Sequence, residues 1–365
     1  SLGRRCGLPE PWSLAGAGLL AASPLYLYSS LWAMSDVPAA AWAAAALLAA
    51  WKSRERPVWS LVCGLCLAVA FLVRPNNFLI ALPIAILIGA SPVRLLGVVG
   101  AALPGVAAWL AINRSAYGAP LQSGYGAIGN EFHLDLVPGT LAYCARWLPL
   151  LLSPIIVAAP AVVALLGRTP RVAALLAAWI ALYVGFYLPY RFTHEDWWYL
   201  RFLLPAAPAL IVAGLLVLET ARRRLLPGSF GPAGRTLGIV LLLAALGVEA
   251  ATLDRLKAWT IGHGERKYLE AGAWLNAHLP PNAVVVSTQF SGSLHYYTPF
   301  ALVRADQLGL PLARRVEAAA RSAGDPVYAV FYPFERESFA ALPGRWALVG
   351  SVEDISILRL EPAAP

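Results

Sequence analysis

The sequence predicts an all-α membrane protein, a multi-span helical bundle followed by a small C-terminal α/β domain. Apolar residues make up 59% of the 365 residues and charged residues only 13%, against about 25% charged residues in soluble proteins. The mean hydropathy is +0.64, so the chain carries more apolar surface than one soluble core encloses. Positive charge is also unevenly distributed, because residues 1–252 hold 17 Lys and Arg against 9 Asp and Glu, whereas residues 253–365 hold 11 of each. This composition excludes a disordered chain and an ordinary cytosolic enzyme, and the neutral C-terminal part argues against a nucleic-acid partner.

The apolar part divides into about nine stretches that approach the 20 residues of a membrane-spanning helix. They are 13–34, 38–51, 58–73, 78–90, 95–112, 139–167, 172–189, 203–219 and 236–252. With the N-terminus inside, alternate loops carry 12 Lys and Arg on one side and five on the other. Basic residues are retained on the cytoplasmic side. This topology therefore places everything after residue 252 outside the cytoplasm.

The last hundred or so residues show patterns of an ordinary globular domain. Apolar residues recur at helical spacing in 265–278, and β-branched runs in 283–287 and 327–332 predict strands. A second helix is expected at 312–322, and two more strands at 346–349 and 355–360 are expected to form an antiparallel pair. We therefore divide the chain into a membrane part, 1–252, and an exterior α/β domain, 253–365.

The start of the chain and its cysteines give two further expectations. The first residue is Ser1, and no small-residue cleavage site follows the first apolar stretch, so we expect a fragment truncated at its N-terminus and no signal peptide. The four cysteines have no regular framework, and Cys63 and Cys66 share one face of a predicted span. Packing explains that pair, and no metal set is indicated.

Asp36 is the first ionisable residue singled out by its place at membrane depth. Such groups are expensive unless they face water, a partner or a substrate. Asp36 lies in the outer turn before Pro38 and is predicted to be a catalytic residue. The alternative is a helix cap, because Ser35 or Asp36 before a proline is a good N-cap.

The segment from Tyr190 to Phe202 concentrates charge and aromatic rings in one outer loop. Arg201 offers an always-charged fork for the phosphate of a lipid, with His194 beside it. Glu195 and Asp196 are expected to bind a sugar hydroxyl, a metal or an acceptor amine. The alternative is an interfacial aromatic belt with snorkelling arginines.

Two other outer segments offer substrate contacts. Arg74, before Pro75, is a second phosphate-binding residue, and its alternative is contact with lipid headgroups. The loop 116–131 is rich in Gly and Tyr and is expected to cover the substrate, with Tyr125 stacking on a sugar ring. A plain flexible connector is the alternative for this loop.

The order of these motifs resembles the polytopic GT-C glycosyltransferases. Pro24 to Pro38, Gly64 to Pro75 and Arg201 to Pro208 are similar to segments of the protein O-mannosyltransferase and aminoarabinose transferase group. The series His194, Glu195, Asp196 before Arg201-Phe202 resembles the His-Lys-Glu and Arg-Phe signature of lipid-anchor mannosyltransferases, with departures in order and spacing.

The resemblance implies an enzyme that transfers a sugar from a polyprenyl-phosphate donor to a lipid, glycan or protein acceptor at the outer face of a membrane. It also implies a bacterial inner or plasma membrane. From the sequence we expect no cofactor; a divalent metal stays open but is not indicated. The family's principal acidic residue lies in the first outer loop, which this chain lacks if it begins beyond the first span, and Asp36 resembles the second acidic position.

Two other functions stay open from the residues alone. A transporter would show broken helices with polar groups at the bilayer midplane, whereas here the polar groups gather at the outer ends of helices. The other is a lipid-binding or glycan-binding scaffold, including a degenerate transferase that only presents an acceptor.

Overall fold

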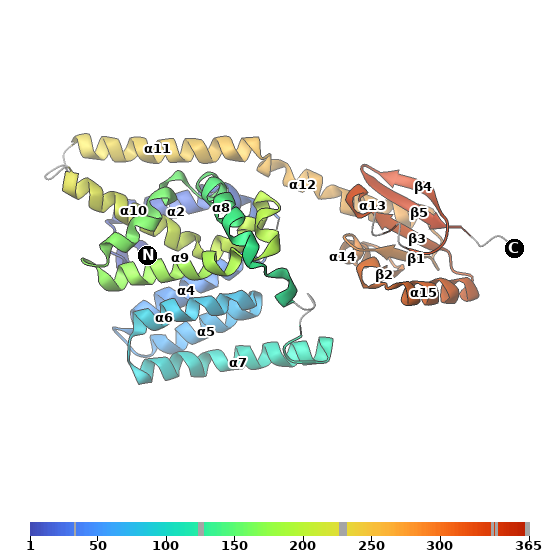
Figure 1. Ribbon diagram of the computed structural model, residues 1–365, viewed down its shortest axis with the longest axis horizontal. Helices are drawn as coiled ribbons and strands as arrows, with labels where there is room; N and C mark the ends of the chain where they lie inside the picture. Colours follow the sequence, from blue (N-terminus) through green and yellow to red (C-terminus); the bar gives the residue numbers. More distant parts are fainter. Residues whose placement is uncertain (33, 123–127, 226–231, 337–338, 340–341, 362–365) are drawn as a thin grey trace. The chain divides into compact units, whose positions relative to one another are not determined.

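The structure is a computed structural model that describes residues 1–32, 34–122, 128–225, 232–336, 339 and 342–361. The chain forms two compact units, Ser1–Trp259 and Thr260–Pro365. The first is helical and the second is built on a sheet (Figure 1).

The helical unit contains eleven α-helices and seven 3₁₀ helices among the described residues, the last of which runs into the second unit. The α-helices are α1 (Leu2–Arg5), α2 (Glu10–Ala22), α3 (Pro24–Leu31), α4 (Asp36–Ser53), α5 (Trp59–Val73), α6 (Ala81–Ile88), α7 (Pro92–Tyr117), α8 (Val137–Leu151), α9 (Pro170–Tyr187), α10 (Ala207–Leu225) and α11 (Pro232–Arg255). The 3₁₀ helices are η1 (Pro75–Ile80), η2 (Ile128–Glu131), η3 (Leu134–Leu136), η4 (Pro154–Leu165), η5 (Arg191–His194), η6 (Trp197–Ala206) and η7 (Ala258–Thr260).

Within the described residues, three helices are long and apolar enough to cross a membrane: Pro92–Tyr117, Pro170–Tyr187 and Trp197–Arg224. A fourth span results if α2 and α3, which meet at a 52° bend, count as one. The expected number of about nine is not confirmed. Proline explains part of the difference, because Pro24 begins a new helix inside 13–34 and Pro154 does the same inside 139–167. These helices are those of an integral membrane protein.

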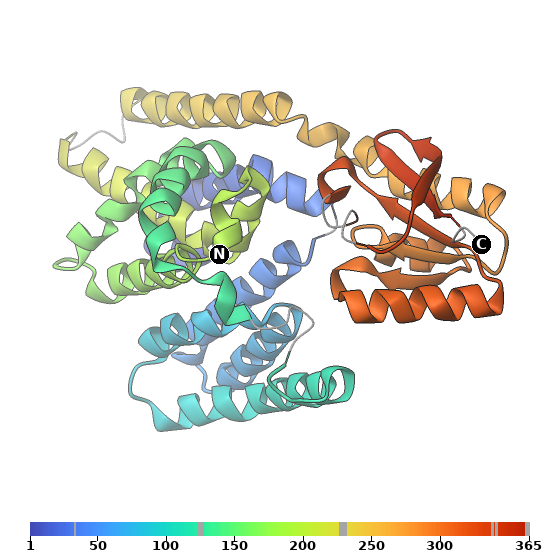
Figure 2. The same ribbon diagram turned by 45° about the vertical axis from the view of Figure 1, so that its right-hand side comes forward.

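Small residues bring the backbones of α5 and α7 close together, and the two helices run side by side in Figures 1 and 2. A Cβ added to Gly64 on α5 would lie 2.3 Å from the carbonyl oxygen of Val98, and one added to Gly105 on α7 would lie 2.7 Å from the Cβ of Ala68. Close approach through small residues is the usual way in which helices associate in lipid, where burial of apolar surface gives little driving force.

The second unit is a five-stranded mixed sheet with helices on both faces. Its helices are α12 (Ile261–Gly264), α13 (Arg266–His278), α14 (Ser291–Tyr297) and α15 (Leu310–Ala323), with short 3₁₀ turns η8 (Ala305–Gln307) and η9 (Pro333–Glu335). The strands are β1 (Val284–Ser287), β2 (Ala301–Arg304), β3 (Val327–Phe331), β4 (Trp346–Val352) and β5 (Ile355–Leu360), in the order β2-β1-β3-β5-β4. Strands β2, β1 and β3 are parallel, and β3, β5 and β4 are antiparallel.

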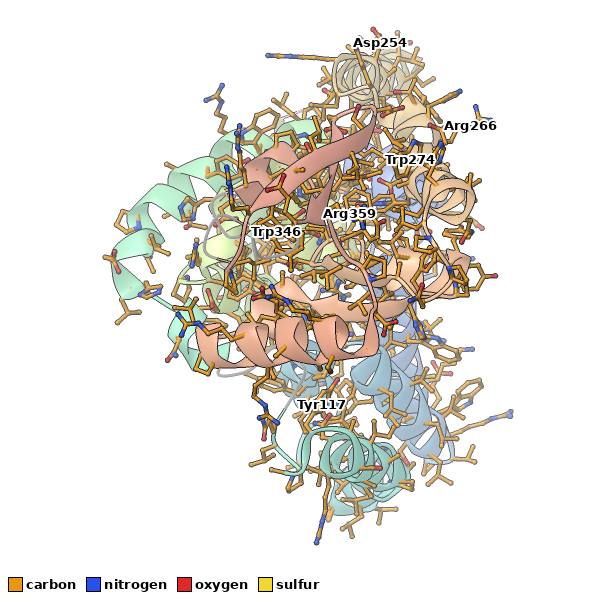
Figure 3. The ribbon with its side chains drawn as sticks, turned by 90° about the vertical axis from the view of Figure 1, so that its right-hand side faces the viewer. Tyr117, Asp254, Arg266, Trp274, Trp346 and Arg359 are labelled. Atoms are coloured by element: carbon orange, nitrogen blue, oxygen red, sulfur yellow. The ribbon has the colours of Figure 1, made fainter. Side chains whose placement is uncertain are left out.

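Alternate residues of β3 build two cores, because successive side chains of a strand point to opposite faces. Tyr328 and Val330 pack with residues of α13 and α14, whereas Ala329 and Phe331 pack with Ala320 of α15 on the other face. Figure 3, which faces this unit, labels Trp274 on α13 and Trp346 and Arg359 on the antiparallel strands. The unit is therefore a three-layer α/β/α sandwich, and the expected antiparallel strand pair is present as β4 and β5.

Candidate active site

Asp36 is the central anion of the site. It occupies the first turn of α4 and is 0% exposed. Its Oδ2 accepts a hydrogen bond of 2.7 Å from Nη2 of Arg74, and Nε of Arg201 lies 3.6 Å from the same oxygen. Burial disfavours the carboxylate and the two guanidiniums favour it. The carboxylate therefore serves as the shared counter-charge of two arginines that are 38 and 165 positions away along the chain.

Arg74 reaches this carboxylate because α5 ends immediately before it. Its backbone is extended, and Pro75 then begins η1, which turns the chain away from the helix axis. Nε of Arg74 donates to Oγ of Ser35 at 3.1 Å, while Nη2 donates to Asp36. Ser35 makes no side-chain capping hydrogen bond to α4. The polar residues before Pro38 thus contact the arginine instead of capping the helix through Ser35.

Arg201 lies in η6 with its side chain only 12% exposed. Its guanidinium carbon is 5.7 Å from the ring centre of Trp32 and 5.0 Å from that of Phe202, distances at which cations and aromatic faces attract. Nη1 donates to the carbonyl of Trp198 at 3.2 Å, whereas the buried Nε makes no hydrogen bond within the described part of the chain. Aromatic rings thus surround this cation and keep it at the helix end.

A polar network that the sequence motifs do not predict anchors the loop after Arg74. Asn76 donates from Nδ2 to the hydroxyl oxygen of Tyr187 at 2.6 Å, and Tyr183 donates its hydroxyl to Oδ1 of Asn77 at 2.7 Å. Tyr187 in turn stacks on Phe202, with ring centres 5.3 Å apart. The two asparagines after Arg74-Pro75 were the available signal, but their tyrosine partners are more than a hundred residues away.

The three polar residues predicted at the start of the 190–202 segment make other contacts. Nδ1 of His194 lies 3.3 Å from Oγ1 of Thr140 on α8. Glu195 pairs with Arg191 at 3.5 Å. Asp196 has no ion pair in the described part of the chain, and its pKa is raised by burial and by the negative charge of Glu195.

Tyr125 lies outside the described residues. Among those that are described, no group of three or more His, Cys, Asp or Glu side chains is placed to hold a metal ion. The structure thus brings Asp36, Arg74 and Arg201 together.

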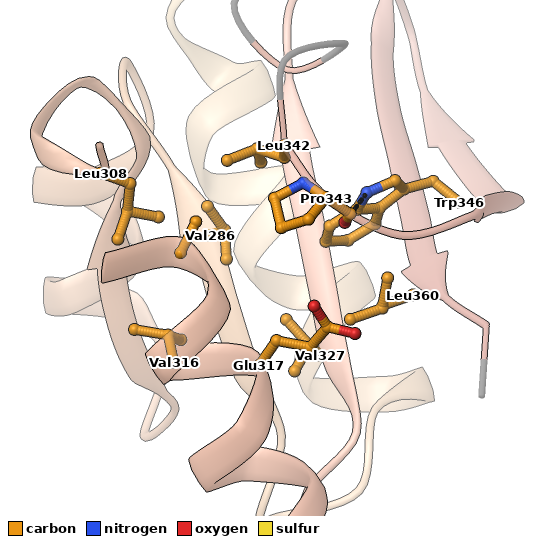
Figure 4. A pocket seen from close by; sticks show the side chains of 10 residues that line it. Val286, Leu308, Val316, Glu317, Val327, Leu342, Pro343, Trp346 and Leu360 are labelled. Atoms are coloured by element: carbon orange, nitrogen blue, oxygen red, sulfur yellow. Dashed lines mark hydrogen bonds between the residues drawn. The ribbon is translucent and has the colours of Figure 1, made fainter. Parts of the chain in front are cut away.

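The C-terminal unit has a cavity of about 20 Å³ between α15 and the sheet, shown in Figure 4. Val286, Leu308, Val316 and Trp346 line it with other apolar residues. Glu317 also lines it, and its Oε1 accepts a hydrogen bond of 2.6 Å from Nη2 of Arg321. A space of this size admits about one water molecule. This cavity is therefore a packing gap and not a ligand site.

The cluster has a net charge of +1 when both arginines and Asp36 are ionised. Two of the five N–H donors of Arg74 are engaged, by Ser35 and Asp36. Nη1 of Arg74 makes no hydrogen bond within the described part of the chain, so its fork is available to a ligand. Planar guanidinium forks match the oxygens of phosphate. The arrangement can therefore bind a phosphate monoester or diester and stabilise negative charge that develops on it.

Comparison with known proteins supports the fold. No family model and no curated protein sequence matches the chain. Two solved structures of ArnT from Cupriavidus metallidurans are similar to it, each at 13% identity. The apo structure has a TM-score of 0.52 and covers 94% of this chain and 78% of ArnT. The structure bound to undecaprenyl phosphate has a TM-score of 0.44 and covers 95% of this chain and 83% of ArnT. The fold of this chain is therefore similar to that of the apo ArnT structure.

Proposed function

We propose that the chain is a membrane glycosyltransferase that transfers a sugar from a polyprenyl-phosphate donor to a lipid, glycan or protein acceptor at the outer face of the membrane. The convergence of Arg74 and Arg201 on the buried carboxylate of Asp36 carries this proposal. A net positive cluster at the ends of apolar helices is suited to an anionic headgroup on a lipid tail. The GT-C-like fold similar to that of ArnT agrees with this chemistry.

The reaction that fits the cluster is a displacement at the sugar's anomeric carbon. The acceptor oxygen or nitrogen forms a bond to that carbon, while the bond from the carbon to the phosphate oxygen breaks and the polyprenyl phosphate leaves. Negative charge grows on the departing phosphate. Preorganised guanidinium donors stabilise such charge more strongly in a dry site than in water.

Asp36 acts in this scheme through the two arginines, because it is 0% exposed and its Oδ2 already faces both of them. Its predicted catalytic role thus becomes that of a positioning residue. Asp196 supplies the carboxylate that receives the acceptor's proton, since it is only partly buried and has no cationic partner among the described residues. Its raised pKa moves it toward the operating pH, which favours general base catalysis.

The test uses the full chain in liposomes and measures polyprenyl phosphate released from a panel of polyprenyl-phosphate sugars with acceptor present. Arg201→Ala removes the charge-assisted hydrogen bonds that the guanidinium would make to the departing phosphate, which contribute about 1.5–3 kcal/mol. We therefore expect turnover to fall by roughly 10- to 150-fold. Arg201→Lys retains the charge but not the planar fork, so its turnover should lie between that of wild type and that of Arg201→Ala.

Arg191→Ala is the matched control. Arg191 belongs to the same loop, but its side chain is 58% exposed and pairs with Glu131 and Glu195, away from Asp36. Its replacement should leave turnover within about twofold of wild type, because exposed ion pairs contribute little. Equal losses in Arg191→Ala and Arg201→Ala, or no release from any donor by folded protein, would contradict the proposal.

A further inference from the structure

A second acidic group lies inside the helical unit, apart from the arginine cluster. Glu249 sits on α11, six residues before the helix ends at Arg255, which is about 9 Å at 1.5 Å per residue. The residue is 1% exposed. Neither carboxyl oxygen has a hydrogen-bond partner in the described part of the chain. An ionisable residue inside a membrane bundle that has no partner is a candidate functional site.

One polar neighbour of Glu249 comes from a segment that packs against α11. Helix α11 packs against α2, α3, α8 and η4. Ser153, between α8 and η4, lies beside the carboxyl and is 0% exposed. The hydroxyl of Ser153 approaches the carboxyl without reaching the geometry of a regular hydrogen bond, and it has no other hydrogen-bond partner among the described residues. A buried carboxyl and a buried hydroxyl therefore face each other with capacity for further hydrogen bonds.

Another buried glutamate shows how this chain satisfies an acid that has a structural role. Glu219 on α10 is 4% exposed, and it accepts hydrogen bonds from Nε of Arg222 at 2.7 Å and from Nε of Arg223 at 2.6 Å. Glu249 has no such counter-charge in the described part of the chain. Both glutamates are therefore buried, but within the described residues only Glu219 has hydrogen-bond partners.

We propose that Glu249 and Ser153 bind a hydroxyl or ammonium group of the sugar carried by the donor lipid. The inference rests on the proposed function. Carboxyl oxygens accept hydrogen bonds and repel phosphate, so this site cannot take the end of the donor that the arginines hold. Helix α3 packs against both η6, which carries Arg201, and α11, which carries Glu249.

The test is protection from dicyclohexylcarbodiimide, an apolar reagent that adds to carboxyl groups in membrane interiors, with modified residues identified by mass spectrometry of the full chain. We expect Glu249 to be modified and the arginine-paired Glu219 to remain unmodified. Three ligands are compared: bare polyprenyl phosphate, the same lipid carrying a neutral hexose, and the same lipid carrying an amino hexose.

The sugar-bearing lipids should lower the modification of Glu249 at least fivefold relative to the bare lipid. Protection by both identifies a hydroxyl as the ligand group, and protection by the amino hexose alone identifies the ammonium. Equal modification with all three ligands, equal protection by bare polyprenyl phosphate, or no modification of Glu249 would overturn the inference.

Two variants separate this role from simple filling of space. Glu249→Gln and Glu249→Leu should both fold, and the KM for the sugar-bearing donor should rise about tenfold while the Kd for bare polyprenyl phosphate stays unchanged. If Glu249 has only a structural role, Glu249→Leu should leave the KM unaltered. That result would refute the inference and leave the proposed function standing. If the wild-type chain does not bind bare polyprenyl phosphate, the proposed function is refuted, and the inference with it.

Discussion

Replacement of Asp36 by Asn gives the sharpest test of the arginine cluster. The substitution keeps the shape of the side chain and removes the negative charge that Arg74 and Arg201 share. At an effective dielectric constant of about 20, unit charges at the observed 2.7 and 3.6 Å attract by roughly 6 and 5 kcal/mol. Desolvation cancels part of this attraction, and breaking a buried ion pair costs about 3–5 kcal/mol. We expect Asp36→Asn to lose stability within that range.

The assay is the free energy of unfolding of the full chain in detergent, with and without inorganic phosphate. A phosphate ion can replace the lost carboxylate between the two guanidiniums, so phosphate should raise the unfolding temperature of Asp36→Asn more than that of wild type. Glu55→Gln is the control, because the Arg5–Glu55 pair is exposed and such pairs contribute about 0–1 kcal/mol. Equal stabilities for Asp36→Asn and Glu55→Gln, with no phosphate effect, would refute the reasoning.

Three further predictions concern other parts of the chain. Gly64→Ala should destabilise the helical unit by about 1–3 kcal/mol through overpacking, whereas Gly100→Ala, which meets no atom within 4 Å, should be neutral or stabilising; thermal unfolding of both compares them. Glu335→Ala should cost about 2–4 kcal/mol and increase hydrogen exchange near β3, because Glu335 accepts from two backbone N–H groups, those of Gln289 and Tyr332. The raised pKa of Asp196 means that the folded chain keeps a proton that the unfolded chain loses near pH 4. This contribution to stability falls as pH rises through the raised pKa, so Asp196→Asn should stabilise the chain more at pH 7 than at pH 4; an equal effect at both would contradict it.

The sequence allowed the C-terminal sheet to be predicted better than the helical unit. Strands β1, β3, β4 and β5 follow β-branched and apolar runs that proline or charge delimits. Strand β2 was missed because Ala301–Arg304 is a short edge strand with exposed and half-buried residues and no alternation. Spans were harder to predict, because Pro24 and Pro154 break apolar stretches that hydropathy reads as continuous.

The candidate site could be predicted residue by residue but not as an arrangement. The rarity of charge in the apolar part pointed to Asp36, Arg74 and Arg201. Both arginines approach the same carboxylate oxygen of Asp36 because of the way α4, α5 and η6 pack together. No local sequence pattern encodes that packing. The lack of a hydrogen-bond partner at Glu249 within the described residues emerges only when α11 is placed against its neighbours.

Helix α7 has a consequence for the bilayer around the protein. Its 26 residues extend for about 39 Å, which exceeds the hydrocarbon thickness of about 30 Å. One flank is fixed to α5, while the other presents Val93, Leu96 and Leu103 to the surroundings, each more than half exposed. The mismatch can be relieved by inclining the helix, by lifting its Arg114 end into the headgroups, or by thickening the adjacent lipid. The inclination of α7 should therefore change with the acyl-chain length of the surrounding lipids.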